Sequence, residues 1–290
     1  MATIALATPS DSLLNASYRQ ENSVDINSTL TLSIQSIQRQ EMIQRVNQHK
    51  IAKDHDITGL KLWDFGLQFA KYLAAKPHFF ANKNIMELGA GCGTLSLTLA
   101  ASANEASSIT VTDAAMESLE LIAANIKQNQ AKLIVPIQVQ RCWWTVEEPE
   151  EPEKTEEPEE PEKTDERPLA DVVLGTDLLY HLTTVESLFA TAARAMKKEC
   201  GVFFLGGMSR FYGTIESIRT AATNLGLSLH FISLQKMTIP EREDDDTSCW
   251  YCDGMFLCVI AHNEQCVAPV LKALDLHIDD SVNDDFEEDY

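Results

Sequence analysis

Glu87-Leu-Gly-Ala-Gly-Cys-Gly93 is the stretch of sequence that decides the fold. It begins inside the short apolar run at residues 85–88, and a segment with the composition of a helix follows it at residues 94–103. Glycines between a strand and a helix let the backbone approach a ligand closely and leave free amide groups pointing at it. The stretch therefore predicts a strand, a ligand-binding loop and a helix, in that order.

Short apolar runs and helix-like segments alternate along the chain around this loop. The expected strands are residues 85–88, 108–112, 134–140, 171–176 and 202–205, and the expected helices are residues 62–73, 94–103, 115–128, 183–198 and 212–225. Residues 227–236 and 250–261 are expected to close the sheet as an antiparallel hairpin. The alternation predicts parallel βαβ units, and so an α/β, Rossmann-like fold with three α/β/α layers and a mostly parallel, seven-stranded sheet.

The chain of 290 residues is long enough for one α/β domain with flanking segments. We expect the domain at residues 28–265, after a disordered segment at 1–27 and before an acidic C-terminal tail at 266–290. Apolar and polar residues alternate at 29–37, which predicts an added strand.

Three features favour an intracellular protein. No stretch reaches the roughly 18 apolar residues that a membrane span needs, and the N-terminus lacks the basic start and long apolar run of a secretory signal. The seven cysteines are an odd number in a chain too large to need disulfides, which favours a reducing compartment. We expect a soluble, monomeric protein in the cytoplasm, with the nucleus as a second location.

The net charge of −21 is concentrated in three segments, residues 147–167, 241–246 and 275–290, and the rest of the chain is neutral. Acidic segments repel phosphates, so we expect no nucleic-acid partner, whereas a basic protein would be attracted. The first segment contains a repeat of nine residues, Glu-Glu-Pro-Glu-Glu-Pro-Glu-Lys-Thr. Its prolines and carboxylates exclude a packed helix or strand and predict an extended surface insertion at 146–168. The insertion is either a tolerated expansion of a loop or a docking arm for basic partners.

The spacing of the glycines favours S-adenosylmethionine over a dinucleotide as the ligand of the loop. Dinucleotide loops follow G-x-G-x-x-G, which would need a glycine where this chain has Thr94. Here Glu87 stands two residues ahead of three alternate glycines. A carboxylate near the loop suits the positive amine of the amino-acid tail of S-adenosylmethionine.

Asp113 ends the expected second strand, twenty residues after Gly93. An acidic side chain at that position is placed to accept hydrogen bonds from both ribose hydroxyls of the cofactor. The alternative is that Asp113 only caps the helix that follows. The loop makes the ribose role the better interpretation.

With these residues in view, the chain resembles the seven-β-strand methyltransferases, and within them the protein-lysine methyltransferases called methyltransferase family 16. Four features between residues 59 and 261 carry the resemblance: Leu62-Trp63-Asp64 upstream of the loop, the loop with Asp113, the pair Cys142-Trp143-Trp144, and Asp177-Leu-Leu-Tyr180. The last is similar to the Asp-x-x-Tyr signature of that family.

The site follows from the residues and the resemblance together. Asp177 and Tyr180 are expected at the carboxyl end of a central strand, near the transferring methyl group, and we assign them as catalytic; for Asp177, capping a helix is the structural alternative. The expected cofactor-binding residues are Trp63, Glu87, Gly89, Ala90, Gly91, Gly93, Asp113, Trp143, Trp144 and Thr176. One of the two neighbouring tryptophans is expected to stack on adenine and the other to be a core aromatic.

The resemblance implies an S-adenosylmethionine-dependent N-methyltransferase, a transferase that methylates a lysine of a non-histone intracellular protein. The alternatives are methylation of a small-molecule amine or of another protein side chain, and a non-catalytic module that binds the cofactor. The acidic residues 241–246 either attract a lysine-bearing protein that is basic near its target or form only a solvated loop. We expect no metal, because Cys249 and Cys252 have no second pair of ligands nearby in the sequence.

Overall fold

The computed structural model describes residues 19–37, 58–103, 105–147, 169–180, 184–209, 213–237 and 254–282. Most of the expected insertion at 146–168, the acidic residues 241–246, both cysteines of the Cys249-to-Cys252 pair and residues 283–290 lie outside these ranges. None of the helices within them has the length and hydropathy that crossing a membrane requires.

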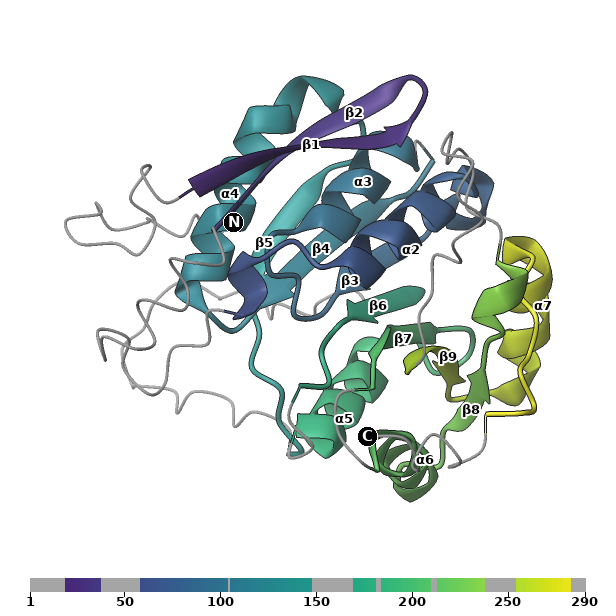
Figure 1. Cartoon of the computed structure of the whole chain (residues 1–290). Helices are drawn as coiled ribbons and strands as arrows, with labels where there is room; N and C mark the ends of the chain where they lie inside the picture. The colour runs from purple at the N-terminus through teal and green to yellow at the C-terminus, as the bar shows by residue number, and fades with distance from the viewer. Residues whose placement is uncertain are drawn as a thin grey trace, which may run out of the picture.

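A seven-stranded sheet forms the centre of the fold (Figure 1). Its strands, in spatial order, are β5 (Ile137–Arg141), β4 (Ser108–Asp113), β3 (Asn84–Glu87), β6 (Val172–Thr176), β7 (Val202–Met208), β9 (Met255–Ala261) and β8 (Ser228–Phe231). The strands from β5 to β7 are parallel, and β9 lies antiparallel between β7 and β8. The expected α/β fold with a mostly parallel sheet and a C-terminal antiparallel hairpin is therefore confirmed.

Helices cover both faces of the sheet, so the expected three layers are present. The α-helices are α2 (Asp64–Ala74), α3 (Thr94–Ser102), α4 (Met116–Asn129), α5 (Val185–Ala195), α6 (Thr214–Asn224) and α7 (Val267–Leu274). The short 3₁₀ turns are η2 (Thr58–Leu60), η3 (Pro77–Phe80), η4 (Gln130–Lys132), η6 (Leu234–Lys236) and η7 (Glu264–Cys266). Buried side chains of α2, α3, α4 and α7 share one core with the sheet, and those of α5 and α6 share another.

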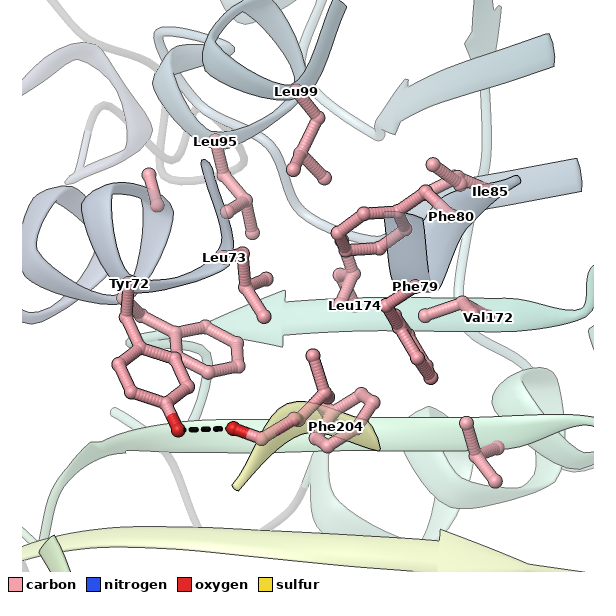
Figure 2. Close-up of a cluster of buried hydrophobic side chains, with 14 of the residues drawn as sticks. Tyr72, Leu73, Phe79, Phe80, Ile85, Leu95, Leu99, Val172, Leu174 and Phe204 are labelled. Carbon is pink, nitrogen blue, oxygen red and sulfur yellow. Dashed lines mark hydrogen bonds between the residues drawn. The ribbon is translucent and has the colours of Figure 1, made fainter. Parts of the chain in front are cut away.

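The two cores follow from the alternation of side chains along the strands. In β7, Phe204 faces the core of α2 and α3, while Phe203 and Leu205 face that of α5 and α6. Figure 2 shows the first of these cores, with Leu95 and Leu99 of α3 reaching toward the strands. Because both faces are buried, the central strands are apolar almost throughout.

Strand β5 begins at Ile137, three residues later than expected. The amides of Ile134 and Val135 donate to the carbonyl of Ala100, at the end of α3, at 2.8 and 3.1 Å. Pro136 follows and has no amide hydrogen, so pairing with β4 starts only after it.

An N-terminal hairpin, β1 (Arg19–Asn27) and β2 (Leu30–Ile37), lies across α3 and α4 (Figure 1). The strand expected at 29–37 is present, but in its own two-stranded sheet. The expectation of disorder was wrong for residues 19–27, because Val24 and Ile26 are buried at alternate positions and the strand pairs with β2.

Two buried asparagines of α4 hold the hairpin to the domain. Asn125 accepts from the amide of Gln35 at 2.8 Å and donates to its carbonyl at 3.1 Å, and Asn129 bonds the amide and carbonyl of Ser33 at 2.9 and 2.7 Å. The side-chain amides thus take the place of a neighbouring strand along β2.

The domain also extends beyond the boundary expected at residue 265. Residues 267–274 form α7, whose Val267, Leu271 and Leu274 are buried at helical spacing, and Leu276 is buried as well. The hydroxyl of Tyr72 on α2 donates to the carbonyl of Leu274, a bond drawn as the dashed line in Figure 2. The acidic character of the C-terminus starts only at Asp275.

Candidate active site

A cavity of about 420 Å³ opens at the carboxyl ends of β3, β4 and β6. Its lining includes both expected catalytic residues, Asp177 and Tyr180, and all the expected cofactor-binding residues except Gly93, namely Trp63, Glu87, Gly89, Ala90, Gly91, Asp113, Trp143, Trp144 and Thr176. Residues separated by more than a hundred positions therefore share one crevice, on the side of a doubly wound sheet where ligands bind.

The glycine loop needs its glycines because of what lies against it. Gly89 and Gly91 have φ of 61° and 56°, in the left-handed region that disfavours other residues. A Cβ at Gly91 would lie 2.4 Å from the carbonyl oxygen of Gly59, and one at Gly89 would lie 2.6 Å from Leu178 and 3.0 Å from Trp144. Gly93 turns the chain into α3 and faces the core, so it is not part of the cavity wall.

Several loop amides are already used inside the protein, contrary to the expectation of free amides. Ala90 donates to the carbonyl of Thr112 at 2.9 Å, Gly93 donates to the carbonyl of Ala90 at 2.8 Å, and Gly91 donates to Asp113 at 2.9 Å. These bonds hold the loop in place and leave fewer amides for a ligand.

Asp113 connects the loop to the next helix. Its Oδ2 accepts from the amide of Gly91, and its Oδ1 accepts from the amide of Ala115, at the start of α4, also at 2.9 Å. The helix-capping alternative is thus part of its role. Asp113 also lines the cavity, and a carboxylate oxygen can accept more than one hydrogen bond.

Glu87 is nearly fully buried, with 3% of its surface exposed. Its Oε2 accepts from the amide of Ser96 at 3.0 Å and from the Ser96 hydroxyl, which ties β3 to the first turn of α3. Burial raises the pKa of the Glu87 carboxyl to about 7, against the opposing effect of the Ser96 hydrogen bonds, and the nearby charge of Asp113 raises it further.

The three tryptophans among the described residues take different positions around the cavity. Trp63 donates from Nε1 to the carbonyl of Thr58 at 3.1 Å. Trp144 is half-buried against Gly89, whereas Trp143 is 59% exposed at the rim, with the Arg141 guanidinium 5.0 Å from its ring centroid. Both members of the pair line the cavity, and Trp144 also packs against the core of α5 and α6. Which of the two stacks on adenine stays a prediction.

Asp177 joins the end of β6 to the start of α2. Its backbone is left-handed, with φ of 57°, and its amide donates to the carbonyl of Gly206 at 2.8 Å. Its Oδ2 accepts from the amide of Gly66, in the first turn of α2, at 3.3 Å. Asp177 therefore caps a helix, as the structural alternative expected. That helix is α2, more than a hundred residues earlier in the chain, and Asp177 itself lines the cavity. Thr176 and Tyr180 lie on the same wall.

Sequence patterns did not single out several residues of this cavity: Gly59, Lys61, Gly66, Thr94 and Ser118. Thr94 and Ser118 are 7% and 1% exposed, and their hydroxyls have no hydrogen-bond partner among the described residues. A buried hydroxyl without a partner costs about 1–3 kcal/mol, so both hydroxyls are suited to hydrogen-bond a polar ligand in the cavity.

These features fit S-adenosylmethionine. The volume is within the roughly 300–1,000 Å³ typical of small-molecule sites. The wall offers a flat indole, carboxylates and unpartnered hydroxyls to a ligand with an adenine, ribose hydroxyls and positive charges. Within the described ranges, no group of three or more His, Cys, Asp or Glu side chains is arranged to hold a metal ion.

Comparisons with known proteins agree with this geometry. Residues 45–210 match a family model described as lysine methyltransferase. The chain is 24% identical, over 198 residues, to the protein-lysine N-methyltransferase EFM3 of Chaetomium thermophilum, a match that covers 68% of this chain and 55% of that protein. The chain thus spans about half the length of the curated relative it matches.

Two solved structures are similar to this chain at low identity. Magnesium protoporphyrin IX methyltransferase from Synechocystis PCC 6803, with S-adenosylmethionine bound, is 13% identical with a TM-score of 0.45, over 69% of this chain and 81% of that one. The ribosomal protein L11 methylase of Lactobacillus delbrueckii subsp. bulgaricus is also 13% identical, with a TM-score of 0.44, over 67% of this chain and 78% of that one.

Proposed function

The chain belongs to the lysine methyltransferase family, and from this premise we propose that it transfers a methyl group from S-adenosylmethionine to the side-chain amine of a lysine in another intracellular, non-histone protein. The observation that carries the proposal is the position of Asp177 and Tyr180. Both line the same crevice as the glycine loop. An acceptor that enters beside Asp177 therefore meets the cofactor site directly.

The residues that would hold the cofactor are those of the cavity wall. Asp113 would accept from the ribose, Trp144 would stack on the adenine, and Glu87 with the hydroxyls of Thr94 and Ser118 would offer further polar contacts. When bound, S-adenosylmethionine supplies a methyl group activated by its attachment to a sulfonium. The protein's own residues bind the cofactor, orient the acceptor amine and favour its neutral form.

The acceptor lysine must be presented as a neutral amine. A lysine with a pKa of about 10.4 is protonated at neutral pH, and removing its proton costs about 4–5 kcal/mol. The aromatic and aliphatic side chains of the cavity, Trp63 and Leu62 among them, disfavour the ammonium form. The Asp177 carboxylate accepts a hydrogen bond from the amine and orients it. Asp177 is not a strong base, so the proton leaves to solvent.

The acidic residues 241–246 support a basic acceptor. They belong to the connection between β8, which ends at Phe231, and β9, which begins at Met255. Met255 pairs with Met208 at the carboxyl end of β7, so the connection ends on the side of the sheet where the crevice opens. A protein with basic residues around its target lysine would be drawn to that edge. Replacing Asp244, Asp245 and Asp246 by Asn should raise KM for the acceptor at low salt and leave kcat unchanged; an unchanged KM would exclude this part of the proposal.

The direct test is to incubate the protein with cofactor carrying a labelled methyl group and a cell lysate. We expect label in a protein band and, after hydrolysis, in methylated lysine. Asp177→Asn should lower the labelling by roughly ten- to a hundredfold, because the neutral amide accepts a weaker hydrogen bond from the amine than the carboxylate does and so orients it less well. The matched control is Asp275→Asn, since Asp275 has the same left-handed backbone, with φ of 56°, but stands at the C-terminal end of α7 and does not line the crevice.

The other possible products separate the competing functions. Label in a small molecule alone would replace the proposal with methylation of a small-molecule amine. Binding of cofactor with no labelled product would indicate a non-catalytic module. Equal labelling by Asp177→Asn and Asp275→Asn would contradict the role of Asp177.

A further inference from the structure

Lys61 is a cavity residue to which neither the sequence pattern nor the proposed reaction assigns a role. It lies between η2 and α2 and is half-buried, and its ammonium is 4.3 Å from the centroid of the Trp63 ring. Among the described residues that line the cavity, Lys61 carries the one basic side chain, against the three carboxyl groups of Glu87, Asp113 and Asp177.

The cofactor needs such a cation. Its amino-acid tail carries a carboxylate as well as an amine, and its sulfonium adds a further positive charge. The three carboxyl groups suit the positive groups and the ribose, but they repel the carboxylate. The amides of Ala90, Gly91 and Gly93 already donate to protein oxygens, so these parts of the glycine loop do not meet the carboxylate either.

The position of Lys61 matches the tail end of the cavity. The carbonyl of Thr58 accepts from both Trp63 Nε1, at 3.1 Å, and the amide of Lys61, at 3.4 Å, which fixes the segment. Three residues after Trp63, the amide of Gly66 donates to Asp177. The segment therefore runs along the part of the wall between the glycine loop and Asp177, and the amino-acid tail must lie there if the methyl group faces Asp177.

We propose that the Lys61 ammonium binds the carboxylate of the cofactor's amino-acid tail, with the Trp63 indole holding the lysine in place before the cofactor arrives. The indole keeps the lysine ammonium near the position where it binds the carboxylate. No complete ion pair among the described residues has to break when the cofactor arrives. The inference rests on the proposed use of S-adenosylmethionine, but it concerns binding only and makes no claim about the acceptor.

The test measures binding of two ligands by calorimetry. S-adenosylhomocysteine has the amino-acid tail, and 5′-methylthioadenosine has the same nucleoside without it. We expect Lys61→Met to weaken S-adenosylhomocysteine about ten- to a hundredfold, equivalent to about 1.4–2.8 kcal/mol, and to change 5′-methylthioadenosine less than about twofold. Lys61→Arg should restore most of the affinity, because it retains the charge.

Two results would overturn the inference. One is an equal loss of both ligands in Lys61→Met, which would indicate general damage to the cavity; the other is unchanged affinity for S-adenosylhomocysteine. Mass spectrometry of the protein incubated with S-adenosylmethionine gives a second readout. Lys61 paired with a carboxylate should remain unmethylated, so methylated Lys61 would contradict the pairing.

The outcome is separable from that of the labelling experiment. Lysate labelling that fails while tail-dependent binding persists would remove the proposed function and leave the role of Lys61. If lysine of a lysate protein is labelled but Lys61→Met does not change binding, the proposed function stands and the role of Lys61 is removed.

Discussion

Replacing Glu87 by Gln should remove a pH dependence of stability that the buried carboxyl group creates. Burial raises the pKa of Glu87 from 4.5 to about 7. Between these two pH values the folded protein keeps a proton that the unfolded chain has already released. Stability is therefore lost as the pH rises through this window, because above it the folded state must bury a charged carboxylate.

The magnitude follows from the shift. One pKa unit corresponds to about 1.4 kcal/mol, so the full shift amounts to about 3 kcal/mol. Roughly 2–3 kcal/mol of this develops between about pH 5 and about pH 8. The Gln side chain keeps the shape of Glu87 and an oxygen that accepts from Ser96, but it has no proton to lose in this range.

The assay is urea unfolding of the cofactor-free protein at several pH values from about 5 to about 8. The free energy of unfolding of Glu87→Gln should rise relative to that of the original protein by roughly 2–3 kcal/mol over this range. Glu216→Gln is the control, since Glu216 is exposed on α6. A difference between Glu87→Gln and the original protein that stays constant within about 0.5 kcal/mol would refute the reasoning.

Three further substitutions test the loop, the hairpin and the C-terminal helix. Gly91→Ala should weaken S-adenosylhomocysteine more than about tenfold in calorimetry, because its Cβ would lie 2.4 Å from the Gly59 carbonyl at φ of 56°; Gly213→Ala, also left-handed but with open space, should leave binding unchanged. Asn125→Ala should cost about 1–3 kcal/mol in urea unfolding and speed hydrogen exchange in β2, and unchanged exchange there would count against the docking role. Tyr72→Phe should cost about 1 kcal/mol and loosen α7 in the same assays; protection of α7 equal to that in the original protein would contradict the tie.

Local patterns in the sequence determined the α/β architecture. The strand, loop and helix around Glu87–Gly93 lie where the alternation of apolar runs and helical periods predicts them, because backbone preference and burial of one face act over a few neighbouring residues. The same holds for Asp177 and Tyr180, which the end of β6 brings to the crevice.

The boundaries of the domain were harder to predict. Strand β1 has a polar composition, and only its pairing with β2 and the burial of Val24 and Ile26 reveal it as structured. The acidic character of the last residues obscured the apolar spacing of Val267 and Leu271 in α7. In both places, composition averaged over a segment concealed a short apolar pattern.

The sequence by itself determined the parallel sheet, the glycine loop and the family resemblance. Only the tertiary structure decided how distant segments complete the cavity: Gly59 packs on Gly91, Asp113 ties the loop to α4, and Lys61 joins the wall. These contacts link elements that no local period relates, and they form when helices from different parts of the chain bury their apolar faces on one sheet. The glycine loop is therefore visible in a few residues, whereas the cavity around it is a property of the folded chain.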